Sequence, residues 1–433
     1  MASVLLRCFQ VTVQLPRLCQ FGRLSGVRQF AVRDRKSVRA SDKRLYRTSF
    51  GMTNNILKRT LSFACGMLIS MVCAGTAAAA EAPAMNTPAK APVKVILDTD
   101  MVELFDDGIA MMMLQNDPGI DLLGVVTVTG NSWANDGMAY LVKQLSVMKT
   151  QKPQPVLAIG EQYPDRRGGG FGRDILKKEL ASYGDVMEGY IGAQETDNPK
   201  SWKDAYKKHY GVSAPDVKIR EDGVNYLIEM AHKYPHQIKL VAIGPTTNIA
   251  RAVQKDPEVA ALFDEVIYMG GAFWVKGNAH ENAEFNIWLD PESTRVAYRA
   301  PFDNQTFVAL DVTDKTIMDH DRFNKIRSHI KNPELLKMFN ESFFAKRFDA
   351  DKDGKFSWFV WDVIAAAITI DPSLILSTRH AYIDCVDQPG ASYGRTVPYM
   401  KDEAPEGARS ASIVQEIDQD RFWKMLYSYL EKF

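Results

Sequence analysis

Residues 93–107 read VKVILDTDMVELFDD, an apolar run that leads directly into a cluster of acidic side chains. The run at 93–97 has the aliphatic and β-branched composition of a buried strand. The ten residues that follow it contain four aspartates and one glutamate. Like charges repel one another, and a carboxylate at the end of a buried strand is costly unless something positive meets it. This stretch is therefore either a solvated turn or a cation site.

The chain after this stretch alternates short apolar runs with helical patterns. The apolar runs are IDLLGVVTV, PVLAIG, IKLVAIG, EVIYMGG and TFVALDV, and the helical patterns among them are DGIAMMMLQN, ANDGMAYLVKQLSVM, GVNYLIEMAHKY, TNIARAVQ and PESTRVAY. Alternation of strand and helix with short turns predicts an α/β fold, doubly wound, with a mainly parallel sheet flanked by helices. We expect one such domain over residues 93–433.

Four polar motifs follow predicted strands: DTDMVELFDD, TVTGN, AIGPTTN and MGGAF. In sheets of this kind ligands bind beyond the carboxyl ends of the strands. Four motifs at one edge are more than a solvated turn requires, so a cation site is favoured. Asp100, Asp106 and Asp107 can face one another if the strand turns sharply into a helix that starts near Gly108. Several carboxylate ligands suit a hard cation such as Ca²⁺.

Two regions fit the alternation less well. We interpret residues 160–220 as an insertion or lid, and its glycine-rich DRRGGGFGRD as a loop, because no strand leads into it and no GK[ST] follows. In the second region, the aspartates of FDADKDG copy the start of an EF-hand loop. The twelfth position of that loop is Val360, where a bidentate glutamate is needed. A surface turn is therefore the better interpretation.

The net charge of zero hides an asymmetry along the chain. Residues 1–80 hold 13 of the 53 Lys and Arg residues and 2 of the 53 acids. Subtraction leaves 40 basic and 51 acidic residues in 81–433, a net charge of −11. An acidic body repels phosphate, so we expect no nucleic-acid partner. The sequence leaves open whether the protein forms a homo-oligomer.

The segment that begins at Met52 contains a basic pair, an apolar stretch and a run of small residues, in that order. This is the pattern of a cleaved secretory signal peptide. A membrane anchor is less favoured, because the apolar stretch is shorter than the ~20 residues that a membrane span needs. We therefore expect a signal peptide over 52–80, a linker over 81–92, and a secreted or periplasmic protein with no stable membrane insertion after cleavage.

Residues 1–51 are rich in arginine and lack a hydrophobic period. We interpret them as a non-native, translated upstream extension, with the true start at Met52. A mitochondrial-type presequence stays open as an alternative, since arginine-rich and acid-poor segments fit that class too. Four of the five cysteines lie before residue 80, which leaves Cys385 alone in the folded domain and predicts no internal disulfide.

The motifs together resemble the nucleoside hydrolase family over about 93–372. That family opens on D-T-D-P-G-x-D-D, and here the second acid pair comes two residues later, as in members with a longer loop. TVTGN, IGPTTNIA, GNAHENAEFNIWLDPE and FVWDVIAAAITIDPSL match later family segments in the right order. The resemblance implies an enzyme that hydrolyses the N-glycosidic bond of ribonucleosides to free base and ribose, with Ca²⁺ as cofactor.

The resemblance also implies roles for single residues. Asp106 would act as general base on the attacking water, which typically contributes about 10²–10⁴-fold in rate. The calcium ligands implied are Asp100, Asp107, Asp362 and the backbone carbonyl of Ile243. The substrate contacts implied are Asn131, Asn278, Glu284 and Asn286 for the ribose hydroxyls, and Trp361 for the base. Asn131, Asn248 and Asp362 could instead cap helices, and Glu284 and Asn286 could be surface turn residues.

The late motif departs from the family pattern at Trp361. The family often carries a histidine there, associated with protonation of the departing base, and an indole cannot deliver that proton at neutral pH. His280, or an acid or tyrosine of the 160–220 insertion, could take that role. The base site could be walled by four aromatic residues, although such residues more often belong to a core: Phe273, Trp274, Phe344 and Trp358.

Two other functions compete with nucleoside hydrolysis. DTDMV satisfies the D-x-D-x-[TV] motif of a haloacid-dehalogenase-type phosphatase, with Asp98 as nucleophile, but that function leaves EFN and WD unexplained. A non-catalytic periplasmic receptor for nucleosides or ribose on the same scaffold is the second alternative, since the family histidine is absent.

Overall fold

The computed structural model describes residues 91–166 and 170–433. The predicted upstream extension, the signal peptide and the linker up to residue 90 lie outside the described residues. Among the residues described, no helix is both long enough and apolar enough to span a membrane.

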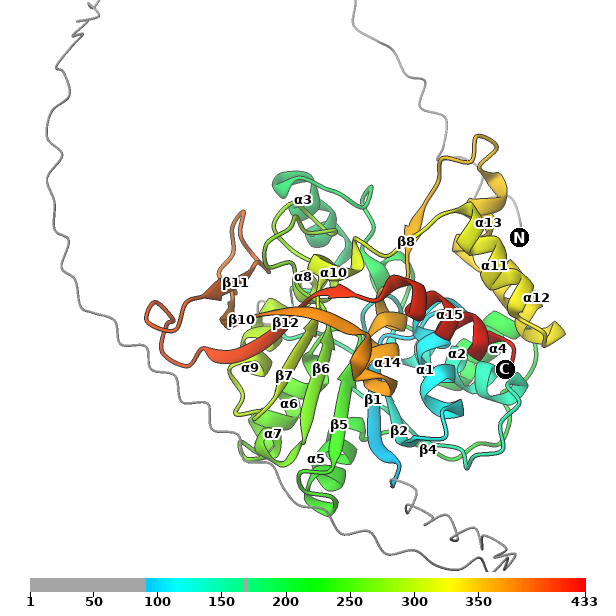
Figure 1. Cartoon of the computed structure of the whole chain (residues 1–433), viewed down its shortest axis with the longest axis horizontal. Coiled ribbons are helices and arrows are strands. Elements are labelled where there is room, and N and C mark those ends of the chain that lie inside the picture. Colours follow the sequence, from blue (N-terminus) through cyan, green and yellow to red (C-terminus); the bar gives the residue numbers. More distant parts are fainter. Residues whose placement is uncertain (1–90, 167–169) are drawn as a thin grey trace, which may run out of the picture. The chain divides into compact units, whose positions relative to one another are not determined.

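The described domain is built on a ten-stranded sheet (Figure 1). Seven neighbouring strand pairs are parallel, and the two pairs that involve β10 are antiparallel. In spatial order the strands are β11 (Thr396–Tyr399), β10 (Ile375–Cys385), β12 (Arg409–Ile417), β7 (Gln305–Val308), β6 (Glu265–Met269), β5 (Ile238–Ala242), β1 (Val93–Thr99), β2 (Ile120–Thr127), β3 (Val156–Ile159) and β4 (Ile219–Arg220). The predicted α/β fold with a mainly parallel sheet is confirmed.

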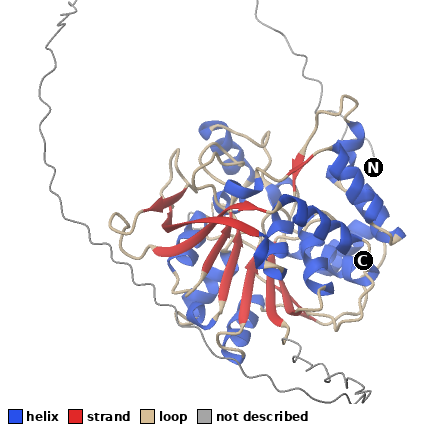
Figure 2. Ribbon diagram, in the orientation of Figure 1, coloured by secondary structure: helices blue, strands red, loops and turns tan. Residues whose placement is uncertain are grey.

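Helices cover both faces of this sheet (Figure 2), because apolar side chains of each strand alternate between the faces. Val95 and Leu97 of β1 pack into one core and Ile96 into the other. The first core is closed by α1 (Asp106–Asn116), α2 (Ala134–Val147), α14 (Trp361–Ile370) and α15 (Gln419–Leu430). The second is closed by α5 (Gly223–Lys233), α6 (Thr247–Lys255), α7 (Val259–Leu262) and α9 (Pro291–Arg299).

The remaining elements add side chains to the first core or form a cluster of their own. A third, smaller apolar cluster joins the predicted insertion to the segment that follows β6, and it includes Trp133. Its elements are α3 (Arg173–Tyr183), the 3₁₀ turn η2 (Gly192–Glu195) and α8 (Phe285–Leu289). The others are α4 (Trp202–Tyr210), α10 (Leu310–Thr313), α11 (His320–His329), α12 (Pro333–Glu341), α13 (Phe343–Ala350), η3 (Pro372–Leu374) and the antiparallel hairpin of β8 (Ile317–Met318) with β9 (Trp358–Phe359).

Three smaller expectations can be compared with this fold. The helix expected near Gly108 begins two residues earlier, so that Asp106 and Asp107 form its first turn. The EF-hand-like segment is a surface turn, as predicted, and two of its aspartates are already engaged: Asp349 pairs with Arg327, and Asp351 pairs with His320. Cys385 is a buried free thiol in β10.

Candidate functional site

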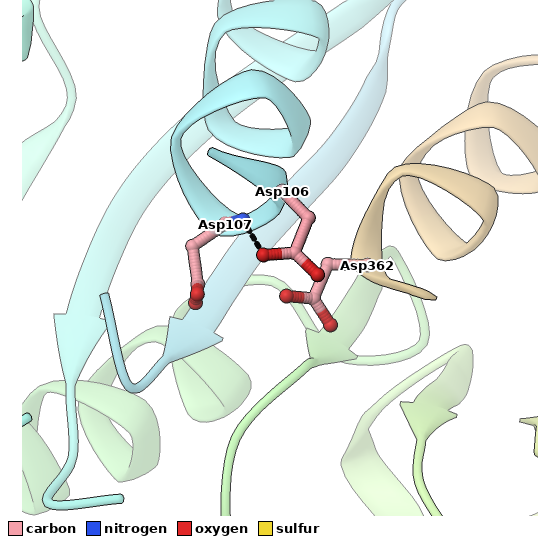
Figure 3. A group of neighbouring side chains, drawn as sticks. All are labelled: Asp106, Asp107 and Asp362. Atoms are coloured by element: carbon pink, nitrogen blue, oxygen red, sulfur yellow. Dashed lines mark hydrogen bonds between the residues drawn. The ribbon is translucent and has the colours of Figure 1, made fainter. Parts of the chain in front are cut away.

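Acidic side chains from two helices meet at the carboxyl edge of the sheet. Asp106 and Asp107 open α1, and Asp362 lies in the first turn of α14. One oxygen of each carboxylate lies within 4.8 Å of the others, and all three side chains are buried (Figure 3). The backbone N–H of Asp107 donates to Asp106 Oδ1 at 3.2 Å. Helix N-termini favour negative charge, which partly offsets the repulsion.

Asp100 reaches the same edge between two glycines of the predicted turn motifs. A Cβ at Gly130 would lie 2.1 Å from Asp100 Oδ2, and one at Gly244 would lie 2.8 Å from the Asp100 backbone nitrogen. Only glycine lets both turns approach so closely. The backbone N–H of Asn131 then donates to Asp100 Oδ2 at 2.7 Å. The motifs TVTGN and AIGPTTN therefore act as a cradle for this carboxylate.

The electrostatics of the cluster would be relieved by a bound cation. Burial raises the pKa of Asp107 to about 7. Burial and then the neighbouring carboxylates raise the pKa values of Asp100, Asp106 and Asp362 well above the ordinary range. Thr99 Oγ1 donates to Asp107 Oδ1, but Asp107 Oδ2 and Asp100 Oδ1 are buried without a hydrogen-bond partner in the described part of the chain. Such unsatisfied, all-oxygen donors fit a hard divalent cation.

The backbone carbonyl of Ile243, a predicted ligand, follows β5 at this same edge. It accepts a hydrogen bond of 3.0 Å from Asn286 Nδ2, which also donates to the carbonyl of Met269 at 3.1 Å. A carbonyl oxygen has two lone pairs, so Ile243 can still offer one to a cation. The structure thus places a predicted metal ligand beside a predicted sugar contact.

Glu284 and Asn286 lie at the start of α8 and are not surface turn residues, because both side chains are buried. The Glu284 carboxylate caps α8 by accepting the backbone N–H of Asn286 at 3.1 Å, and its other oxygen accepts the backbone N–H of Gly271 at 3.1 Å. Burial raises the pKa of Glu284 to about 7. The two side chains therefore have fixed positions near the carboxylate cluster, and Glu284 also acts electrostatically on Asp362.

The two other asparagines predicted to contact the sugar are half-buried. Asn278 Oδ1 accepts the backbone N–H of Phe285 at 2.8 Å, which ties the loop before α8 to the helix. Asn131 Oδ1 accepts a hydrogen bond from the Tyr190 hydroxyl at 3.1 Å. Tyr190 lies in the insertion, for which the sequence predicted only that some acid or tyrosine could reach the site.

His280 does not suit the role of leaving-group acid. Its ring is fully buried, Nδ1 accepts the backbone N–H of Asn282, and Nε2 lies 3.1 Å from the carbonyl of Tyr393. Burial lowers the pKa of His280 and keeps the ring neutral. One ring nitrogen is engaged by its own loop and the other lies against the distant Tyr393 carbonyl, so this histidine is structural.

Asn248 is neither a helix cap nor a ligand to the cluster. Its Nδ2 donates to Asp98 Oδ2 at 2.8 Å and to the carbonyl of Thr127, and its Oδ1 accepts the N–H of Glu161. This side chain therefore ties together the ends of three strands. Asp98 is fully buried against it, which argues against Asp98 as the nucleophile of a phosphatase.

The aromatic candidates for the base site divide into two groups. The ring centroid of Phe344 lies 4.2 Å from that of Phe105, the residue before Asp106. The ring of Trp358 lies 5.2 Å from Phe344 and 5.7 Å from Trp361, between centroids, so the four rings form one cluster. Trp361 is half-buried in this aromatic cluster, beside the acidic site. Two other candidates lie elsewhere: Phe273 packs against Phe307 in the second core, and Trp274 lies under the guanidinium of Arg379.

Comparison with protein families gives one match that covers most of the chain. Residues 95–424 match the family model described as "Inosine-uridine preferring nucleoside hydrolase". The match extends past residue 372, the end of the segment over which the motifs resemble this family, and reaches into α15.

Individual relatives agree with that family match. The chain is 27% identical over 349 residues to the inosine-uridine preferring nucleoside hydrolase of Leishmania major, covering 79% of this chain and 98% of that protein. It is 29% identical over 339 residues to the pyrimidine-specific ribonucleoside hydrolase RihB of Escherichia coli, covering 77% of this chain and 95% of that protein.

Solved structures share the fold. A plant nucleoside hydrolase superposes with a TM-score of 0.62 at 22% identity, covering 78% of this chain and 99% of that one. A purine-preferring ribonucleoside hydrolase from Gardnerella vaginalis superposes with a TM-score of 0.59 at 23% identity, covering 78% of this chain and 98% of that one.

Proposed function

This chain belongs to the inosine-uridine preferring nucleoside hydrolase family, whose members hydrolyse the N-glycosidic bond of ribonucleosides, and we propose that its activity depends on a bound calcium ion. The observation that carries the proposal is the group of four buried carboxylates at the sheet edge, Asp100, Asp106, Asp107 and Asp362. Four buried acids without a counter-ion oppose folding, and a divalent cation relieves that cost.

Asp100, Asp107, Asp362 and the carbonyl of Ile243 are the groups that would hold the ion. An all-oxygen set of this kind suits Ca²⁺, whereas zinc sites favour nitrogen and sulfur ligands. When bound, the ion would lower the pKa of the attacking water and hold it toward the sugar. The unsatisfied oxygens of Asp100 and Asp107 support this assignment.

Asp106 would take a proton from the attacking water as the new bond to the anomeric carbon forms and the bond to the base breaks. Asp100 is a second candidate for this step. Each of the two carboxylates has one oxygen that accepts a backbone N–H, from Asn131 for Asp100 and from Asp107 for Asp106, and Asp100 Oδ1 accepts no hydrogen bond from the described residues. The transition state resembles a ribosyl oxocarbenium ion, and the surrounding carboxylates would stabilise its positive charge.

The sugar would be held by Asn131, Asn278, Glu284 and Asn286. Trp361 would contact the base from the aromatic cluster, as a stacking or lining group. Because its indole cannot supply a proton, the departing base would be protonated by another group or by solvent.

An assay of reducing sugar and free base tests this function. The purified protein is incubated with inosine, uridine, guanosine and cytidine. Stoichiometric release of ribose and base from at least one nucleoside is the expected result. Tight binding of nucleoside without release of ribose would indicate the receptor alternative. In a parallel incubation with nucleoside monophosphates, release of phosphate without ribose would indicate the phosphatase.

We also propose that the protein is secreted or periplasmic, on the basis of the signal pattern over 52–80. N-terminal sequencing of the mature protein tests this, with Glu81 as the expected first residue. A mature N-terminus well before Glu81 would contradict it.

A further inference from the structure

Tyr190 lies where the insertion meets the sugar side of the site. It comes from the segment between α3 and η2, and its hydroxyl donates to Asn131 Oδ1 at 3.1 Å. Burial, and after it the negative charge of Asp100, raises the pKa of Tyr190 well above its ordinary range. The phenol therefore keeps its proton at neutral pH and stays a hydrogen-bond donor.

The backbone that carries Tyr190 is held in an unusual conformation. Glu188, Gly189 and Gly192 have φ angles of 55°, 81° and 58°, in the left-handed region. A Cβ at Gly192 would lie 2.3 Å from the carbonyl oxygen of Gly130, which itself accepts the N–H of Ala193 at 2.8 Å. Glycine adopts such angles readily, whereas a residue such as Glu188 keeps one only where the surroundings hold it in place. This turn is thus fastened to the TVTGN motif, one residue before Asn131.

The ring of Tyr190 reaches across to the other group of predicted sugar contacts. Its centroid lies 5.4 Å from that of Phe285, which stands between Glu284 and Asn286 in α8. One side chain of the insertion therefore links the end of β2 to the start of α8. These two segments supply most of the residues assigned to the ribose.

The hydrogen bonds of Asn131 determine what its carboxamide can offer to a ligand. The backbone N–H is taken by Asp100, and Oδ1 is taken by Tyr190. Nδ2 donates to no acceptor among the described residues. The group left for a ligand is therefore a donor, which suits the oxygen of a sugar hydroxyl whose own proton goes to a carboxylate.

We propose that Tyr190 is a positioning residue that orients the Asn131 carboxamide toward a ribose hydroxyl and so strengthens sugar binding. This inference rests on the proposed function of the site. It assigns a role in the reaction to the insertion, and it predicts that the Tyr190 hydroxyl acts on sugar binding only through Asn131.

The test compares steady-state kinetics of wild type, Tyr190→Phe, Asn131→Ala and the double variant on the best ribonucleoside. Phenylalanine keeps the ring contact with Phe285 and removes only the hydroxyl. A sugar contact made equally in ground and transition states changes KM and not kcat. We expect KM to rise about 3- to 10-fold in Tyr190→Phe, which corresponds to the loss of one hydrogen bond. The kcat of this variant should stay within about twofold of that of wild type. A merely structural role would instead lower the yield of active enzyme and leave KM unchanged.

Tyr183→Phe is the matched control, because it makes the same change in the same insertion, on a ring that contacts His280 instead. Its KM should equal that of wild type. In the Asn131→Ala background the Tyr190→Phe effect should vanish. Full additivity of the two changes, or a wild-type KM in either Tyr190→Phe or Asn131→Ala, would overturn the inference. Wild type that releases no ribose from any nucleoside would instead refute the proposed function.

Discussion

The carbonyl oxygen of Ile243 accepts a hydrogen bond from the side-chain amide of Asn286, with 3.0 Å between the two atoms. Ile243 follows strand β5, and Asn286 lies in α8, 43 residues later in the chain. The first is assigned to the cation and the second to the sugar. Under these proposed assignments one direct contact would join cation binding to sugar binding, and a change at Asn286 should then affect both.

Asn286→Ala should weaken the binding of both the sugar and the cation. The variant leaves the buried carbonyls of Ile243 and Met269 without their donor, which costs about 1–3 kcal/mol of stability. We expect a higher KM for nucleoside, weaker calcium binding by calorimetry and a lower midpoint in denaturant. Asn282→Ala removes a similar amide–carbonyl bond outside the site and should leave calcium affinity unchanged. Wild-type calcium affinity in Asn286→Ala would contradict the joint assignment.

Asp106→Asn and Asp100→Asn distinguish the two candidates for the general base. Asp106→Asn retains an oxygen to accept the N–H of Asp107, so the fold should persist while kcat falls about 10²–10⁴-fold. Asp100→Asn should mainly weaken calcium binding. Kinetics at saturating calcium separate the two effects. Appreciable turnover by Asp106→Asn, together with an inactive but calcium-loaded Asp100→Asn, would move the base role to Asp100.

The sequence predicted the parts of this structure that depend on local pattern. The strands that became β1, β2, β3, β5, β6 and β7 are continuous apolar runs, because a central parallel sheet is buried on both faces. The acids of α1 could be grouped from the sequence because they are close neighbours in the chain. The contribution of Asp362, more than 250 residues away, came only from the family resemblance.

Other features had no local signal. The antiparallel end of the sheet, where β10 pairs with β11 and β12, depends on long-range pairing that periodicity does not reveal. His280 is a polar residue in the GNAHEN motif, and only the fold shows that one ring nitrogen serves its own loop and the other contacts the carbonyl of Tyr393. Tyr190 lies in a segment without helical or strand period, where glycines with positive φ set its direction.

Asp290 should make the stability of the protein depend on pH. Burial raises the pKa of Asp290 from 3.8 to about 6 in the fold. Between about pH 4 and 6 the folded state therefore binds more protons than the unfolded state, and stability falls as pH rises through that window. The slope for one such group is at most about 1.4 kcal/mol per pH unit.

Denaturant unfolding of Asp290→Asn at pH 4, 5 and 6 measures this effect. The variant should show a flatter dependence on pH than wild type, because asparagine does not titrate. Asp303→Asn makes the same change on an exposed side chain and should follow wild type. An equal difference between Asp290→Asn and wild type at all three pH values would show that Asp290 does not titrate in this range.

Trp361→Ala should weaken contacts to the base more than contacts to the sugar. Its ring belongs to the aromatic cluster with Trp358 and Phe359, at 5.7 and 5.5 Å between centroids, and it is only half-buried. We expect a higher KM for nucleosides and unchanged inhibition by free ribose. Equal losses for nucleoside and ribose, together with a lower unfolding midpoint, would show that Trp361 serves core packing only.

The central claim is that buried carboxylates at the sheet edge hold a catalytic cation. A calorimetric titration of chelator-treated protein with calcium tests it most directly. Wild type should take up one calcium ion per chain and regain nucleoside hydrolysis in proportion to that uptake. Asp107→Asn should lose the site, and Asp353→Asn, in the EF-hand-like turn, should keep it. Full hydrolytic activity in protein that binds no calcium would contradict the account.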